Sequence, residues 1–92
     1  MEHDIKTGDI VRSKAGRDSG RYFVVVRTEE NFAFVCDGDL RKIDSPKRKK
    51  FRHLNYTGEN SSFALEKIKN GEKLTNTEVR REIQEFCDRN NA

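Results

Sequence analysis

The residues of this sequence best suited to chemistry are cations, and they gather in one half of the chain. Residues 1–57 carry 13 Lys and Arg against nine Asp and Glu, whereas residues 58–92 carry six against seven. Between Arg41 and Arg52, seven cations stand against the single anion Asp44. A field of that sign and density attracts polyanions, of which nucleic acid is the commonest inside cells. For such a run taken alone, a solvated basic loop is the alternative interpretation.

A second group of cations surrounds a tight turn. Gly16 and Gly20 allow the backbone to bend where other residues would be strained. Planar guanidinium groups suit phosphate, because their fork of donors meets two oxygens at once. The cations that we expect at one rim of this hairpin are Arg12, Lys14, Arg17 and Arg21.

Metal and catalytic chemistry find little support in the sequence. His3 and His53 stand alone, and Cys36 and Cys87 lie 51 positions apart, without zinc-ligand spacing. No Ser-His-Asp set, paired carboxylates or phosphate-binding glycine loop can be argued. We therefore expect no enzyme, no cofactor and no metal site. Two isolated thiols are typical of a reduced cytoplasmic protein, with a disulfide between them as the alternative.

Length and composition narrow the class of protein further. The chain has 92 residues, of which 33% are hydrophobic and 38% charged, and it has no Trp. It is too short for a large enzyme, and we expect no small-molecule substrate. No apolar stretch approaches the roughly 20 residues that a membrane-spanning helix needs. The polar start at Met1–Asp4 does not resemble a secretory signal, so we expect a cytoplasmic protein with no membrane partner.

The elements that must position these cations are predicted to be short strands. β-branched and aromatic runs separated by turn residues indicate strands before residue 57. Five short strands in such a length favour a small barrel, because closure removes exposed edges. The predicted strands are Asp9–Ser13, Arg21–Arg27, Phe32–Cys36, Leu40–Ile43 and Lys50–Leu54.

After residue 60 the apolar spacing becomes helical. Val79, Ile83 and Phe86 fall on one helical stripe, and a capping box that begins at Thr75 precedes them. With so little apolar surface, the helices must pack on the barrel or on a partner. The spacing predicts helices over residues 62–70 and 76–88. The chain then divides into a barrel domain and a helical extension, residues 1–57 and 58–92.

Three ordered motifs carry a family resemblance. They are Ala-Gly-Arg-Asp-Ser-Gly-Arg at 15–21, Asp-Gly at 37–38 and Pro-Lys-Arg-Lys-Lys-Phe-Arg-His-Leu at 46–54. Together they resemble the KOW motif, in the form found in the L14e family of archaeal and eukaryotic ribosomal proteins and in small bacterial KOW-domain proteins. The resemblance covers about residues 7–55. It implies an SH3-like barrel that binds RNA, usually ribosomal RNA, with ribosomal proteins as possible neighbours. Together with the helices predicted from the apolar spacing, the expected fold class is mainly β, a small SH3-like barrel followed by a helical pair.

The resemblance also implies which residues meet RNA. In the family, the loop between the first two strands and the basic residues after the proline face nucleic acid. On this chain the corresponding positions are Arg12, Lys14, Arg17, Arg21, Arg41, Lys42, Lys47, Arg48, Lys49, Lys50, Arg52 and His53. The motif glycines are Gly8, Gly16 and Gly20.

Four further questions stay open beside this interpretation. Phe51 could stack on a base or anchor the last strand of the barrel. Of Tyr22 and Phe23, one is expected in the core and the other as a candidate stacking surface. DNA could replace RNA as the polyanion. A protein-interaction module, docking through the barrel or the amphipathic helix 76–88, is the alternative function.

Overall fold

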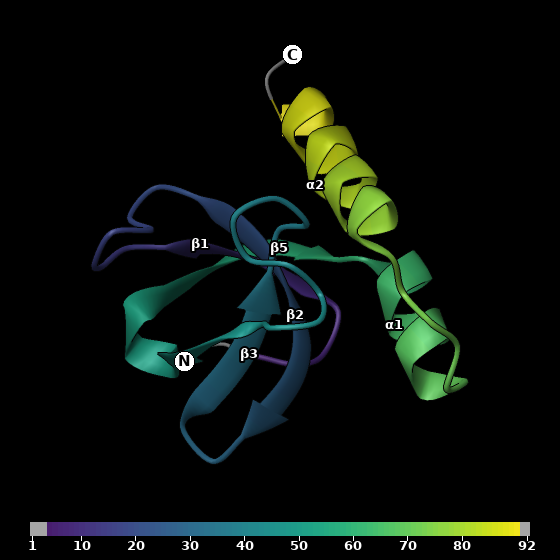
Figure 1. The fold of residues 1–92 in the computed structure, drawn as a ribbon. Helices are drawn as coiled ribbons and strands as arrows, with labels where there is room; N and C mark the ends of the chain where they lie inside the picture. Colours follow the sequence, from purple (N-terminus) through teal and green to yellow (C-terminus); the bar gives the residue numbers. More distant parts are fainter. Residues whose placement is uncertain (1–3, 91–92) are drawn as a thin grey trace.

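The computed structural model describes residues 4–90, in which an antiparallel sheet of five strands is followed by two helices (Figure 1). The strands are β1 (Asp9–Ser13), β2 (Tyr22–Glu29), β3 (Phe32–Cys36), β4 (Lys47–Lys50) and β5 (Leu54–Asn60). A 3-10 turn, η1 (Phe51–His53), joins β4 to β5, and the helices are α1 (Ser62–Lys69) and α2 (Asn76–Asn90). The prediction of a mainly β chain with two C-terminal helices is confirmed.

The central strand β2 is buried on both of its faces. Phe23, Val24 and Val25 are consecutive, and none of them is exposed to solvent. Because successive side chains of a strand point to opposite sides, both faces of the sheet must be covered. The inner core consists of Ile5, Val11, Phe23, Val25, Ala33, Val35 and Leu54. The helix-side core consists of Ile10, Val24, Cys36, Ala64, Leu74, Val79 and Phe86.

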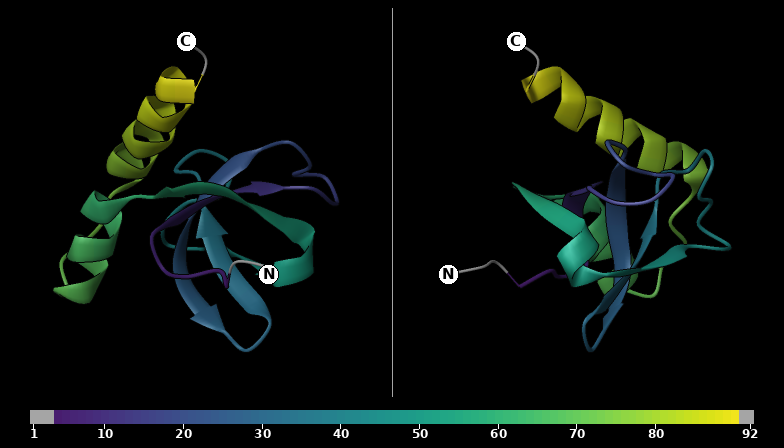
Figure 2. Two further views of the ribbon diagram at one scale, coloured as in Figure 1. Left: turned by 180° about the vertical axis from the view of Figure 1, so that it is seen from behind. Right: turned by 90° about the vertical axis from the view of Figure 1, so that its left-hand side faces the viewer.

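The two helices lie on one side of the sheet and cover its helix-side core (Figure 2). The apolar stripe of α2 faces the sheet, since Val79 is fully buried and Phe86 is 5% exposed. The Phe86 ring packs against that of Tyr22 at 5.3 Å between centroids. The predicted capping box also forms, with the amides of Thr75 and Glu78 each donating to the other's side chain. The stripe therefore packs on the sheet itself.

The sheet curls around its inner core. Its strand order is β4-β3-β2-β1-β5, yet only the three residues of η1 separate the two edge strands along the chain. The carbonyl of His53 in η1 accepts from the Lys14 amide at 2.9 Å, and the Phe51 amide donates to the Asn31 carbonyl at 3.0 Å. Register shifts in β1–β5 and β2–β3 provide local bends. The hydrogen-bonded order ends at β4 and β5, so a closed barrel stays a prediction.

The predicted strand at Leu40–Ile43 is wrong. These residues form bends and a turn, with Leu40 65% exposed. The cause is Asp37, whose Oδ1 accepts from the amides of Asp39 and Arg41, both at 2.9 Å. A carboxylate that binds two nearby amides holds the chain in a turn rather than a strand.

The predicted strand at Lys50–Leu54 is also wrong. Lys50 ends β4, Phe51–His53 form η1, and Leu54 begins β5. The fourth strand is instead the basic run Lys47–Lys50, which pairs with β3. The fifth runs to Asn60, past the predicted domain boundary at residue 57.

The two cysteines differ in their burial. Both are free thiols, Cys36 fully buried and Cys87 half-buried. Burial, aided by the negative charge of Asp37, raises the pKa of Cys36 to about 12. Because the thiolate is the reactive form, an aromatic disulfide reagent at pH 8 should modify Cys87 alone in the folded chain and both thiols in denaturant. Rapid modification of two thiols without denaturant would contradict this burial.

Candidate nucleic-acid interface

Asp18 binds two of the cations that the sequence places at the interface. Its Oδ2 accepts from Nη2 of Arg41 at 3.1 Å and lies 3.6 Å from Nζ of Lys49. The side chain of Asp18 is 6% exposed and that of Lys49 is 9% exposed. Lys49 is therefore part of a buried ion pair, in which the Asp18 carboxylate balances its charge.

Asp37 binds a third predicted cation, Arg21. Nη2 of Arg21 donates to Oδ2 of Asp37 at 2.8 Å, and the side chain of Asp37 is 7% exposed. Burial alone would raise the pKa of Asp37, but the bonds from Arg21 and from the amides of Arg41 and Asp39 outweigh it and lower that pKa. The hydrogen bond to Asp37 in turn raises the pKa of Arg21. This ion pair ties the start of β2 to the turn after β3.

Other predicted cations lie on the surface against aromatic rings or carbonyls. The Arg48 guanidinium lies 3.5 Å from the ring centroid of Phe32, with Glu29 3.9 Å from its Nε. The Arg12 guanidinium lies 5.9 Å from the centroid of Tyr22. Lys42 donates through Nζ to the Asp39 carbonyl at 2.8 Å. Tyr22 is thus packed between β1 and α2, while Phe23 is the core residue of the pair.

The remaining predicted cations have no acidic partner among residues 4–90. They are Lys14, Arg17, Lys47, Lys50 and Arg52, and all are exposed. Arg17 lies in the loop between β1 and β2, where both motif glycines adopt positive φ, +74° at Gly16 and +89° at Gly20. Gly8 also has positive φ. His53 is half-buried in η1, where its backbone carbonyl accepts a hydrogen bond from the Lys14 amide.

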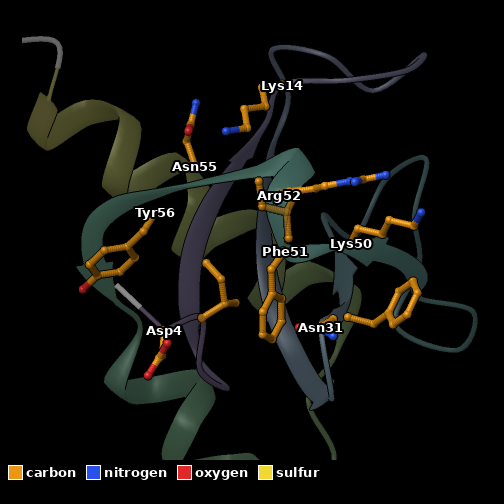
Figure 3. A pocket seen from close by; sticks show the side chains of 11 residues that line it. Asp4, Lys14, Asn31, Lys50, Phe51, Arg52, Asn55 and Tyr56 are labelled. Carbon is orange, nitrogen blue, oxygen red and sulfur yellow. The ribbon is translucent and has the colours of Figure 1, made fainter. Parts of the chain in front are cut away.

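Three of these cations, Lys14, Lys50 and Arg52, stand around a cavity of about 870 Å³ (Figure 3). The floor of this cavity is apolar and buried, formed by Ile5 and Leu54. Its half-buried aromatic lining residues are Phe32, Phe51 and Tyr56. Its polar rim is exposed and consists of Asp4, Lys14, Asn31, Lys50, Arg52 and Asn55. We call this feature the η1 cavity.

Four segments build the η1 cavity. Residues 50–56, from the end of β4 through η1 into β5, supply most of the lining. The chain before β1, Lys14 just after β1, and residues 31–32 at the start of β3 supply the rest. In Figure 3 the ring of Phe51 stands in the middle, with Tyr56 and Asp4 on one side and Asn31 and Lys50 on the other. The bonds of η1 to Lys14 and Asn31 hold these segments together.

Sequence reasoning missed much of this lining. It considered Phe51 as a stacking residue but did not single out Tyr56, Asn55, Asn31 or Asp4. Tyr56 and Asn55 lie in a strand rich in polar residues, whose partner β1 is some 40 residues away in sequence. The one available signal was the alternation of Leu54 and Tyr56, which places both on one face.

Residues 4–90 contain no candidate metal-binding cluster and no helix that could span a membrane. Across residues 4–90, no three His, Cys, Asp or Glu side chains come close enough to hold a metal ion. His3 lies outside that range. Neither α1 nor α2 has the length and apolar character required to cross a bilayer.

A comparison of the chain with protein-family models finds no match, and a comparison with curated protein sequences finds none either. The likeness to KOW-domain proteins therefore rests on the motifs at 15–21, 37–38 and 46–54.

Proposed function

We propose that this chain is a non-catalytic RNA-binding module of the SH3-like type, which acts in the cytoplasm on ribosomal RNA. The observation that carries the proposal is the set of exposed cations with no acidic partner among residues 4–90, three of which stand around the η1 cavity. A cation balanced by a buried carboxylate gains little from phosphate, whereas an unbalanced one releases counterions when it binds. Three such cations, Lys14, Lys50 and Arg52, stand around the same cavity and can therefore contact neighbouring phosphates.

Contacts of this kind recognise backbone more than sequence. Lys and Arg on an exposed rim reach phosphate oxygens, and the rim amides of Asn31 and Asn55 can hydrogen-bond 2′-hydroxyls. Arg17, at the tip of the loop between β1 and β2, extends the cationic surface beyond the cavity. The proposal thus assigns RNA contact to Lys14, Arg17, Lys47, Lys50 and Arg52 first.

Charge removal at the rim should lower the salt dependence of RNA binding. We expect Lys14→Gln/Arg52→Gln to reduce the slope of log K against log salt concentration by about 1.4 for single-stranded RNA, since each lost phosphate contact removes about 0.7. Fluorescence anisotropy with a labelled single-stranded RNA 12-mer at several salt concentrations measures this slope. The same titrations with single-stranded DNA show whether the 2′-hydroxyl contributes.

The matched control removes the same charge elsewhere. Lys69→Gln/Lys73→Gln changes two exposed cations at the end of α1 and after it, neither of which lines the η1 cavity. We expect this variant to keep the parental slope within about 0.3, because it removes no phosphate contact. An equal loss of slope in both variants would mean that net charge alone, rather than this rim, drives binding.

A further inference from the structure

We propose that the η1 cavity receives one unstacked base of single-stranded RNA, stacked against the rings of Phe51 and Tyr56. The inference rests on the proposed RNA-binding function and adds to it the conformation of the RNA that is bound. It follows from the graded lining of the cavity, from its charge and from its size.

The lining changes in polarity from floor to rim, as a nucleotide does from base to backbone. Ile5 and Leu54 at the floor are 8% and 5% exposed, so the bottom of the cavity is apolar. Above them stand the half-buried rings of Phe51 and Tyr56. A base has two apolar faces and a polar edge, and it stacks on such rings regardless of its identity.

The charge of the rim selects an anionic ligand. Lys14, Lys50 and Arg52 surround the opening against the single acid Asp4. Three cations disfavour a positively charged ligand and suit the phosphates on either side of an inserted base. The amides of Asn31 and Asn55 can each donate and accept at the edge of a base.

The size of the cavity fits one nucleotide of single-stranded RNA rather than an RNA double helix. A volume of about 870 Å³ lies within the range of small-ligand sites and exceeds what one base fills, which leaves room for part of its ribose. Both faces of a base in a duplex are already stacked, and its edge is paired. Only an unpaired nucleotide can therefore enter without the energy of extrusion from a helix.

The chain contains a natural reporter for this contact. It has two tyrosines and no Trp, so a Tyr22→Phe variant leaves Tyr56 as its sole tyrosine. Tyr22 lies outside the η1 cavity and packs against Phe86, which a phenyl ring can also do. Titration of this variant with a single-stranded oligoadenylate 8-mer should quench the Tyr56 fluorescence with saturation. An RNA duplex of eight base pairs should bind more weakly and leave the Tyr56 emission largely unchanged.

A second measurement separates stacking from electrostatics. Phe51→Leu should weaken binding of the 8-mer roughly 5- to 150-fold, the range for loss of one base–aromatic stack, with the salt slope unchanged. The matched control is Phe34→Leu, which alters a half-buried phenylalanine of β3 outside the cavity. It should keep the parental affinity within about two-fold. Circular dichroism of both variants checks their fold, and the Tyr22→Phe titration tests the cavity without altering it.

The outcomes distinguish this inference from the function on which it rests. If single-stranded and duplex RNA bind equally, with Tyr56 emission and the Phe51→Leu affinity unchanged, base insertion is wrong and backbone binding stands. If neither RNA binds at low salt, the proposed function fails and this inference with it. Saturable quenching by the 8-mer alone, together with the loss in Phe51→Leu, supports both.

Discussion

An Asp18→Ala variant should be less stable than the parent chain by about 3–5 kcal/mol, the range for removing one partner of a buried ion pair. The Asp18 carboxylate is 6% exposed and is the acid nearest to Lys49, which is 9% exposed. Without it, the Lys49 ammonium must stay buried without a partner or leave its place in β4. Arg41 would lose its bonds to Asp18 as well. Urea denaturation followed by circular dichroism measures the change in unfolding free energy.

Two further variants locate the origin of that loss. Asp44→Ala removes an exposed acid from the same basic segment and should change the unfolding free energy by less than about 0.5 kcal/mol. Adding Lys49→Met to Asp18→Ala should recover part of the lost stability, because an apolar side chain needs no counter-charge. A loss of under 1 kcal/mol in Asp18→Ala would mean that water, not Asp18, balances Lys49.

A Phe86→Ala variant should be destabilised by a similar amount, about 3–5 kcal/mol, through the cavity that the lost ring leaves. Phe86 is 5% exposed in the helix-side core and packs on Tyr22 of β2. Because that core includes residues of both helices and of the sheet, the whole chain should still unfold in one transition. Thermal unfolding followed by circular dichroism and by tyrosine fluorescence should give coincident curves.

The control for this prediction lies two residues before Phe86 on α2, where the side chain is exposed. Gln84→Ala changes an exposed residue whose side chain bonds only to Asp88 of the same helix among residues 4–90. It should alter stability by less than about 0.5 kcal/mol. Two separate transitions, or a Phe86→Ala variant as stable as the parent, would show that the helices are an independent unit that only rests on the sheet.

Elements with strong local signals are predictable from this sequence. The bounds of β1 and β3 match the predicted ranges, and α1 and α2 begin at Ser62 and Asn76, the residues predicted. The capping box at Thr75 forms as well. In each case the apolar periodicity or the cap lies within the element itself, so no distant residue is needed to read it.

Elements whose conformation depends on residues outside them are not predictable from this sequence. Strand β4 is Lys-Arg-Lys-Lys, without an apolar residue, and its extended form follows from pairing with β3. The segment at Leu40–Ile43 has strand-like residues, yet Asp37 holds it in a turn, and the side chain of Asn76 in α2 accepts from the Ile43 amide. In β4 the pairing with β3 overrides local propensity, whereas at Leu40–Ile43 the nearby Asp37 carboxylate and the distant Asn76 side chain override it.

The candidate site likewise has features that the sequence predicts and features that only the fold reveals. The sequence locates the cations, but it does not indicate which of them Asp18 and Asp37 bind. Only the fold brings these acids against Lys49, Arg41 and Arg21 and so separates balanced from unbalanced cations. The η1 cavity could not be predicted, since it joins the chain before β1, Lys14 after β1, the β2–β3 turn and residues 50–56.

The basic strand β4 has a consequence that does not depend on any ligand. Within residues 4–90 it pairs only with β3, so its other edge offers backbone donors and acceptors to a strand of another molecule. Its exposed Lys47, Arg48 and Lys50 repel a second copy that approaches in register. Acetylation of Lys47 and Lys50 would weaken that repulsion, and only Arg48 would keep its charge. The same positive charge therefore protects the chain against edge-to-edge aggregation whenever no polyanion covers it.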